Sequence, residues 1–154
     1  MEFNLVALGG TFDIIHAGHI AILDKGFSIS KKVIIGLTSD ELVQKKGKKL
    51  LYDFQTRFST LESLLKDRFP NSVFEIAKLD NDFGPAVIED NVNALVVSEE
   101  TRSKGQLLNK LRLEQGQPPV TIIIVPMVLA KDGSRISTTR IRNSEIDAKV
   151  TYVN

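Results

Sequence analysis

The sequence predicts an α/β fold with a single doubly wound parallel sheet of five strands. Short apolar runs and amphipathic helical segments alternate about five times along the 154 residues. The apolar runs are continuous, as expected for strands that are covered on both faces of a sheet. Such an alternation gives parallel strands joined by right-handed crossovers. We expect one domain over residues 1–154, with residues 147–154 as a C-terminal tail that shows no clear pattern.

The predicted elements follow from apolar spacing and from the residues that interrupt it. An apolar run over residues 3–8 ends at Gly9 and Gly10, and helical spacing begins at Ala17. Residues 38–40, Thr-Ser-Asp, have the composition of a helix cap, and Pro70 follows the clearest amphipathic helix. The predicted strands are 3–8, 33–37, 72–79, 94–97 and 120–125; the predicted helices begin at 17 and 41, span 54–69, 104–115 and 137–146, and include a short one ending near 91.

A sheet of this kind predicts where a ligand binds. Ligands of open α/β sheets lie beyond the carboxyl ends of the strands, where the strand order reverses. Three segments follow predicted strand ends, namely residues 9–19, 98–101 and 125–137. We expect these segments to converge on one crevice.

The composition argues against several classes of protein. A net charge of +1 does not favour binding to nucleic acid or to a membrane surface. The absence of cysteine excludes disulfides and thiolate metal sites. The N-terminus shows no basic leader, and no apolar run is long enough to span a bilayer. We therefore expect a cytoplasmic protein with small-molecule partners and no nucleic-acid or membrane partner.

The strongest chemical signal is the segment 9–19, with the sequence GGTFDIIHAGH. It contains the chain's two histidines, His16 and His19, whose spacing at a helix start places both rings on one side. Free N–H groups at a helix N-terminus attract anions, and glycines allow close backbone approach. A pair of glycines also occurs in ordinary turns, and a His-x-x-His pair can bind zinc. Because only Asp13 or a distant carboxylate could complete a metal site, we predict a phosphate pocket and no resident metal.

A second signal lies at residues 136–142, with the sequence ISTTRIR. Hydroxyl groups at a helix N-cap and a guanidinium one turn later can hold phosphate oxygens. Alone, the segment is equally typical of a capped helix with a basic face.

Together, the two segments resemble the H-x-G-H and I-S-S-T-x-I-R signatures of the nucleotidyltransferase superfamily, with Thr138 replacing the middle serine. The resemblance implies a Rossmann-like nucleotidyltransferase fold that binds ATP with Mg²⁺. A side chain at Gly18 is expected to crowd the nucleotide. The implied catalytic residues are Thr11, His16 and His19, and the implied nucleotide-binding residues are Gly9, Gly10, Phe12, Gly18, Ser98, Glu99, Ser137, Thr138 and Arg142.

Within this superfamily, the chain resembles archaeal-type phosphopantetheine adenylyltransferases up to about Ile146. The segments 33–41, 82–86, 97–101 and 125–130 carry this resemblance. It implies transfer of the adenylyl group of ATP to 4′-phosphopantetheine, giving dephospho-CoA and pyrophosphate. The bacterial type has Thr in place of His16 and G-L-R in place of residues 98–100, so its substrate contacts do not carry over to this half of the pocket.

Three alternatives stay open from the sequence. A nicotinamide-mononucleotide adenylyltransferase is disfavoured because the chain has no Trp to stack on the ring. Cytidylyltransferases typically carry R-T-E-G where this chain has D-G-S-R at 132–135. A non-catalytic nucleotide-binding module would bind ATP without releasing pyrophosphate.

The resemblance also implies that a lysine after the second strand holds the acceptor phosphate. Lys45, Lys46 and Lys48 are the candidates, and the sequence does not choose among them. Arg57 is a weaker candidate, with an ordinary exposed helix position as its alternative. The sequence gives no signal for the oligomeric state or for feedback by CoA.

Overall fold

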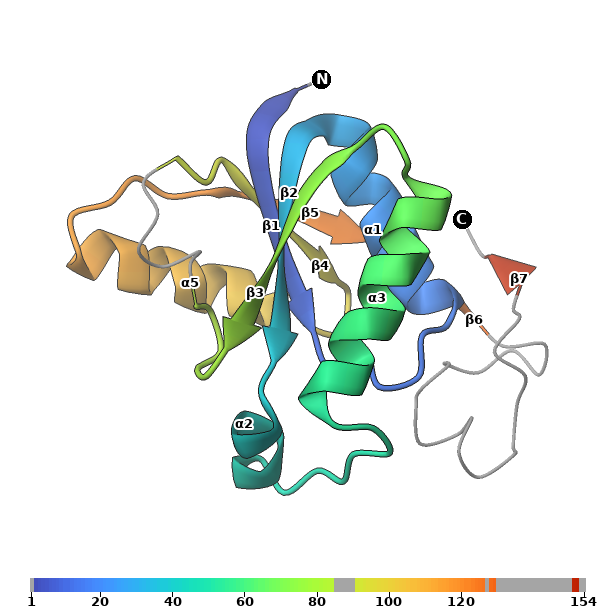
Figure 1. The fold of residues 1–154 in the computed structure, drawn as a ribbon. Coiled ribbons are helices and arrows are strands. Elements are labelled where there is room, and N and C mark those ends of the chain that lie inside the picture. The colour runs from blue at the N-terminus through green and yellow to red at the C-terminus, as the bar shows by residue number, and fades with distance from the viewer. Residues whose placement is uncertain (1, 85–90, 127, 130–150, 153–154) are drawn as a thin grey trace.

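The computed structural model describes residues 2–84, 91–126, 128–129 and 151–152. Five parallel strands form one sheet in the order β3-β2-β1-β4-β5 (Figure 1). This arrangement confirms the predicted fold class, and the strand order reverses between β1 and β4. The strand bounds are β1 Phe3–Gly10, β2 Ser30–Thr38, β3 Val73–Leu79, β4 Ala94–Ser98 and β5 Thr121–Val125.

Helices cover both faces of the sheet. Helices α1 (Ala17–Ile29) and α3 (Phe54–Arg68) lie on one face, and α5 (Ser103–Glu114) lies on the other (Figure 1). Because successive strand residues face opposite ways, Val6 and Leu8 of β1 pack with α1 and α3, while Leu5 and Ala7 pack with Leu108 of α5. Both cores are apolar, which explains why the strands read as continuous apolar runs.

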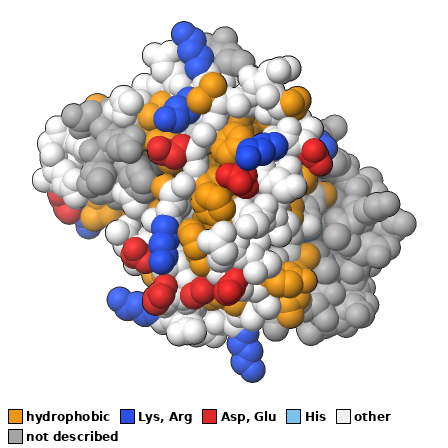
Figure 2. Space-filling model, viewed as in Figure 1, with side chains coloured by type: hydrophobic (Ala, Val, Ile, Leu, Met, Phe, Trp, Pro, Cys, Tyr) orange, Lys and Arg blue, Asp and Glu red, His pale blue; other side chains and the backbone are white. Residues whose placement is uncertain are grey.

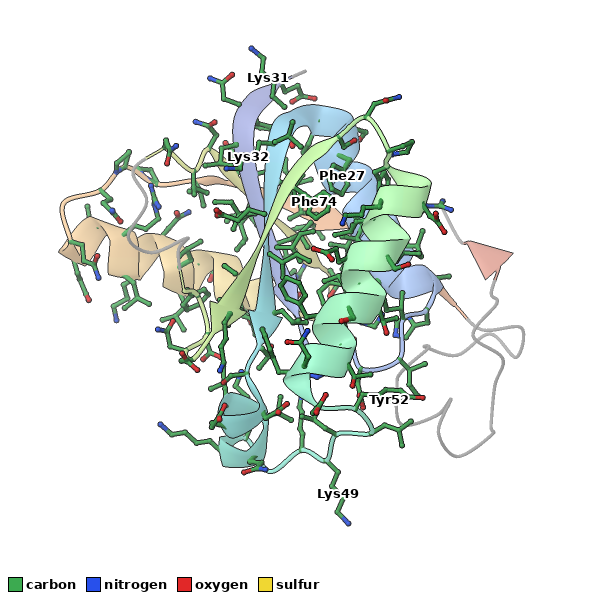
Figure 3. All side chains as sticks on the ribbon, in the orientation of Figure 1. Phe27, Lys31, Lys32, Lys49, Tyr52 and Phe74 are labelled. Carbon is green, nitrogen blue, oxygen red and sulfur yellow. The ribbon has the colours of Figure 1, made fainter. Side chains whose placement is uncertain are left out.

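The core beneath α1 and α3 is rich in aromatic rings. Phe27 of α1 and Phe74 of β3 lie between the sheet and these helices, whereas Lys31 and Lys49 point outward (Figure 3). Phe69, just past the end of α3, stacks on Phe27 with a centroid distance of 4.4 Å. This contact packs the end of α3 against α1.

Two helices begin at caps close to the positions that the sequence indicates. The short helix α2 (Asp40–Lys45) begins after Ser39, whose hydroxyl accepts a hydrogen bond from the Leu42 N–H at 3.1 Å. Helix α3 begins after Asp53, whose carboxylate accepts from the Thr56 N–H at 2.9 Å. Each cap satisfies a backbone donor that the helix itself leaves unpaired.

The carboxyl ends of β1, β2 and β3 are tied together. The Thr38 hydroxyl donates to the Gly10 carbonyl at 3.1 Å, and the Ser39 N–H donates to the Leu79 carbonyl at 2.8 Å. The Leu79 side chain fills the space beside Gly36, where an added Cβ would lie 2.6 Å from the Leu79 Cδ1. The edge of the sheet that faces the predicted crevice is therefore closely packed.

A second, two-stranded sheet pairs β6 (Val128–Leu129) with β7 (Thr151–Tyr152) in antiparallel fashion. Part of the segment without a clear sequence pattern thus forms a strand. The predicted helices at 137–146 and near residue 91 lie outside the described residues. Among the described helices, none has the length and apolarity that a bilayer crossing needs. Charged side chains of both signs are scattered over the face seen in Figure 2.

Candidate active site

The two histidines cap the first turn of α1 reciprocally. His16 is the N-cap residue, and its Nδ1 accepts a hydrogen bond from the Gly18 N–H at 3.1 Å. The His19 Nδ1 accepts from the His16 N–H at 3.2 Å, and the two rings stack with centroids 4.0 Å apart. Because each Nδ1 acts as an acceptor, a neutral ring carries its proton on Nε2. Both histidines therefore present an N–H donor on the side away from the helix backbone.

Both imidazoles are neutral at physiological pH. Burial lowers the pKa of His16 from 6.5 to about 4. Burial, and then the nearby charge of His16, lowers the pKa of His19 from 6.5 to about 3. A general base works best when its pKa is near the working pH. These histidines are therefore suited to donating hydrogen bonds rather than to accepting protons.

Phe12 shapes the loop that precedes α1. Its backbone has φ of 50°, a left-handed conformation that is uncommon for a bulky residue. The buried Phe12 ring packs against His19, with centroids 4.9 Å apart, and an added Cβ at Gly10 would lie 3.1 Å from it. Gly18 also lies close to the His16 ring, and its expected role of leaving room for a nucleotide stays a prediction. A Cβ at Gly18 would lie 2.9 Å from the His16 Cε1, so a side chain there would displace the His16 ring.

Arg57 is buried, with 1% exposure, so its interpretation as an ordinary exposed helix residue is wrong. Its Nη1 donates to the Thr11 carbonyl at 2.9 Å and to the Thr38 carbonyl at 2.8 Å. Its Nε donates to the Tyr52 carbonyl at 3.1 Å, and its Nη2 pairs with the Asp40 carboxylate at 2.7 Å. One guanidinium thus joins the ends of β1 and β2 to the connection before α3.

Asp13 provides a second link between the same segments. Its two carboxylate oxygens accept from the Leu51 N–H at 2.8 Å and from the Tyr52 N–H at 2.9 Å. The sequence suggested Asp13 only as a possible third metal ligand. Its contacts instead anchor the histidine-bearing loop to residues 51 and 52. No group of three or more His, Cys, Asp or Glu side chains with metal-binding geometry occurs in the described part of the chain.

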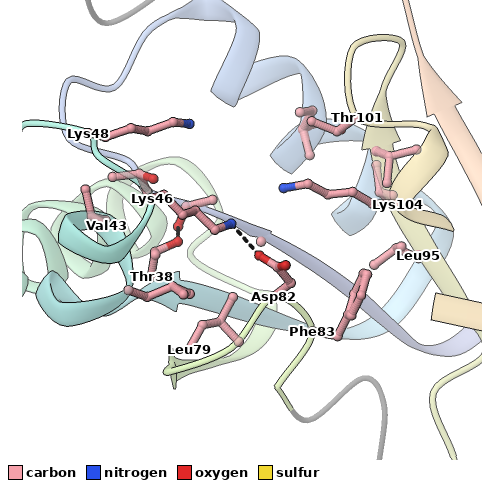
Figure 4. A pocket seen from close by; sticks show the side chains of 17 residues that line it. Thr38, Val43, Lys46, Lys48, Leu79, Asp82, Phe83, Leu95, Thr101 and Lys104 are labelled. Atoms are coloured by element: carbon pink, nitrogen blue, oxygen red, sulfur yellow. Dashed lines mark hydrogen bonds and ion pairs between the residues drawn. The ribbon is translucent and has the colours of Figure 1, made fainter. Parts of the chain in front are cut away.

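A pocket with a cavity volume of ≈ 130 Å³ opens at the reversal of strand order (Figure 4). Its wall includes residues 9–11 at the end of β1, Thr38 of β2 and residues 95–97 of β4. Lys46 and Lys48 line it, whereas Lys45 does not. The histidines are not part of this wall. The loop that carries them reaches the pocket at Thr11, which lines the wall, and the next residue, Phe12, packs its ring against His19.

Sequence reasoning missed two charged residues of this pocket, Asp82 and Lys104. Asp82 forms an ion pair with Lys46, and this hydrogen bond holds the pKa of Asp82 below its usual range. Burial of its ammonium, and then the positive charge of Lys46, lower the pKa of Lys104, while Asp82 opposes the shift. The sequence could have indicated them only by their positions after strands. Asp82 follows β3, and Lys104 lies in the first turn of α5, after β4.

The other predicted site residues divide into two groups. Ser98 ends β4, and its hydroxyl lies 3.0 Å from that of Thr101, while Glu99 is exposed. These residues are near the pocket, because Thr101 lines it. Ser137, Thr138 and Arg142 lie outside the described residues, so their predicted approach to the histidines stays a prediction.

Comparison with known proteins assigns the chain to a family. Residues 7–144 match the family model described as cytidylyltransferase-like. A phosphopantetheine adenylyltransferase of Methanopyrus kandleri is 35% identical, over 95% of this chain and 92% of the relative. Its counterpart in Methanosarcina acetivorans is 41% identical, over 92% of this chain and 91% of the relative.

Solved structures agree with the assignment. A protein of unknown function from Archaeoglobus fulgidus is 30% identical, with a TM-score of 0.71 over 78% of this chain and 87% of that one. A putative nicotinate-nucleotide adenylyltransferase from Vibrio parahaemolyticus, 14% identical, shares the fold with a TM-score of 0.59 over 92% of this chain and 80% of that one. The chain therefore belongs to the cytidylyltransferase-like family and groups there with archaeal phosphopantetheine adenylyltransferases.

Proposed function

We propose that this protein transfers the adenylyl group of ATP to 4′-phosphopantetheine, giving dephospho-CoA and pyrophosphate. Relatives of this name match nearly the full length of the chain. The observation that carries the proposal is the position of two neutral histidine donors beside a lysine-lined pocket at the reversal of strand order. We infer that the triphosphate lies against the histidines and that the phosphorylated acceptor lies in the pocket.

The chemistry needs charge stabilisation rather than a base. An oxygen of the acceptor phosphate attacks the α-phosphorus of ATP and forms the new phosphoanhydride bond. The bond from the α-phosphorus to the bridging oxygen breaks, and its electron pair leaves with pyrophosphate. Because the acceptor phosphate is already anionic, no proton must be removed from it. Histidines with pKa values of about 4 and 3 in the free site suit this reaction as hydrogen-bond donors.

Within this proposal, His19 contacts the α-phosphate and His16 the β- and γ-phosphates. Thr11 is proposed to hold the two reacting phosphates, because it lines the pocket and belongs to the loop that leads to the histidines. Residues 9, 10, 12 and 18 shape the loop, as their packing indicates. Ser98 and Glu99 contact the nucleotide, and Ser137, Thr138 and Arg142 hold the ATP tail.

The pocket is the proposed acceptor site. Lys46 and Lys48 line it and are the proposed phosphate ligands, whereas Lys45 is not among the lining residues. Leu42, Val43 and Leu79 give the pocket an apolar side that suits the pantetheine arm. The proposed role of Arg57 is positional, because its guanidinium already binds three backbone carbonyls and a carboxylate.

Mg²⁺ is proposed to enter with ATP. Mg²⁺ commonly keeps several waters and binds substrate phosphates instead of an all-protein cage. Asp82 is the carboxylate in the pocket lining, and it is paired with Lys46. The donor set therefore fits an ion held by phosphate oxygens and water, which would neutralise charge on the leaving pyrophosphate.

The test is an assay of nucleotide and acceptor together. The protein is incubated with Mg²⁺ and either ATP or CTP, and with 4′-phosphopantetheine, nicotinamide mononucleotide or no acceptor. Pyrophosphate is measured, and the product is identified by mass spectrometry. We expect dephospho-CoA from ATP and 4′-phosphopantetheine. Turnover only with CTP or only with nicotinamide mononucleotide would refute the proposal, as would calorimetric ATP binding without any pyrophosphate.

A further inference from the structure

The acceptor pocket carries an excess of positive charge. Three lysines line it, Lys46, Lys48 and Lys104, against one acidic side chain, Asp82. Gathering like charges around one pocket is unfavourable unless an anion compensates them. A phosphate monoester carries about −1.5 to −2 charges at pH 7, which matches this excess. The pocket is therefore balanced electrostatically when a phosphate group occupies it.

The cations come from two separate parts of the fold. Lys46 and Lys48 follow α2, while Lys104 lies in the first turn of α5, on the other side of the pocket. The ammonium groups of Lys48 and Lys104 point toward each other across the pocket (Figure 4). Asp82 and its partner Lys46 lie near the space between them (Figure 4). An anion in the centre would contact groups from both walls.

The backbone that carries Lys104 is firmly placed. The Lys104 N–H donates to the Thr101 carbonyl at 2.9 Å. The next residue, Gly105, packs so closely on β5 that an added Cβ would lie 2.7 Å from the Ile122 Cδ1. The start of α5 is thus held against the sheet, and the long Lys104 side chain projects from a fixed base into the pocket.

The charge environment distinguishes Lys104 from Lys46. The ammonium of Lys46 already has a carboxylate partner in Asp82. Burial and the charges of Lys46 and Lys48 lower the pKa of Lys104, with Asp82 acting in the opposite direction. The Lys104 residue is exposed, but its ammonium projects into the pocket, where a phosphate would offset the repulsion from Lys46 and Lys48.

Resting on the proposed function, we propose that Lys104 binds the acceptor phosphate from the α5 side, opposite Lys48. Asp82 holds Lys46 in place beside them. The phosphate is then clamped between the connection after α2 and the first turn of α5. This clamp makes the phosphate group of the acceptor a determinant of affinity, and not only the attacking group.

The test compares three variants with the wild-type protein. Lys104→Met removes the charge and keeps most of the side-chain length, while Lys104→Arg keeps the charge. Lys110→Met is the matched control, because Lys110 is exposed on the same helix, as Lys104 is, but does not line the pocket. We expect Lys104→Met to raise KM for 4′-phosphopantetheine by about 10- to 100-fold, the loss typical of a charged hydrogen bond. KM for ATP should stay within about twofold, and Lys104→Arg should restore most of the affinity.

A binding measurement separates the phosphate from the rest of the acceptor. Calorimetry compares 4′-phosphopantetheine with pantetheine, which lacks the phosphate. We expect Lys104→Met to weaken the binding of 4′-phosphopantetheine and to leave the binding of pantetheine unchanged. Equal weakening of both ligands, a raised KM for ATP alone, or unchanged KM values would overturn the role of Lys104. A wild-type protein that makes no dephospho-CoA would instead refute the proposed function, so the two failures are distinguishable.

Discussion

The Nη1 of Arg57 donates a hydrogen bond to the Thr11 carbonyl at 2.9 Å, across a separation of 46 residues in the chain. Thr11 belongs to the histidine-bearing loop and lines the pocket at the reversal of strand order. The same guanidinium binds the Thr38 carbonyl and the Asp40 carboxylate. A single buried charge therefore links two strand ends beside the site.

Replacement of Arg57 by methionine is expected to lower the free energy of unfolding by about 3–5 kcal/mol. The variant leaves Asp40 without its cation and three carbonyls without their donor. The measurement is urea unfolding followed by circular dichroism. Arg68→Met is the matched control on α3, because the Arg68 pair with Asp24 is about half exposed, with side-chain exposures of 47% and 44%. That control should lose no more than about 1 kcal/mol. Equal losses in the two variants would contradict the network.

Substitution of His19 tests the proposed contact with the α-phosphate. His19→Ala is expected to lower kcat about a hundred- to a thousandfold, as for loss of one preorganised donor. His19→Gln separates catalysis from folding, because a Gln at this helix position can still accept from the N-cap N–H. We expect that variant to unfold like the wild type and to be about as inactive as His19→Ala. Near-normal turnover in a folded His19→Ala variant would disprove the assignment.

Gly18→Ala should impair activity without destabilising the fold. The added methyl would lie 2.9 Å from the His16 Cε1 and would push that ring out of place. Alanine favours helices by about 1 kcal/mol over glycine, which offsets part of the cost of moving the ring. We expect kcat to fall at least about tenfold while the melting temperature changes little. Gly47→Ala is unsuitable as a control because Gly47 has φ of +75°, so Lys110→Met serves instead. An unchanged kcat would show that the His16 position is unimportant.

The histidines should make stability depend on pH in a defined direction. In the unfolded chain they take up protons below about pH 6.5. In the folded protein they do so only near their pKa values of about 4 and 3. The unfolded state therefore binds more protons below pH 6.5, and stability is complete above that pH and falls as the pH decreases. Between pH 6.5 and 5, we expect a loss of about 1–2 kcal/mol per histidine.

Urea unfolding at pH 7.5, 6 and 5 measures this dependence. A His16→Asn/His19→Gln double variant keeps acceptors at both capping positions and removes the titrating rings. Its stability should vary less over this pH range than that of the wild type. Equal slopes in the two proteins would mean that the imidazoles are not withdrawn from water.

The strands were predictable because burial on both faces leaves a continuous apolar run. Their full lengths were not, because pairing extends beyond the covered segment. Ser30 pairs with Phe3 and Lys32 with Leu5, so β2 begins three residues before its apolar run. Apolar spacing reports which residues helices cover, whereas strand length depends on the backbone ladder.

The site was partly predictable for a related reason. His16 and His19 are close in sequence, so helical geometry alone brings their rings together. Lys104 and Asp82 come from different strand ends, and only the strand order brings them to one pocket. Arg57 did carry a signal. It lies four residues before Leu61 and eight before Leu65, so helical spacing places it on the same buried face of α3.

The packing around Leu79 has a consequence for altering the range of acceptors. Its side chain lines the pocket and occupies the space beside Gly9, Gly36 and Gly84. Because these glycines have no side chains, they would not fill that space if Leu79 were shortened. The size of the Leu79 side chain therefore contributes to the depth of the pocket on this side. Shortening Leu79 would create room for wider molecules without rearranging a strand, which makes it the first position to vary in an effort to adenylylate unnatural phosphates.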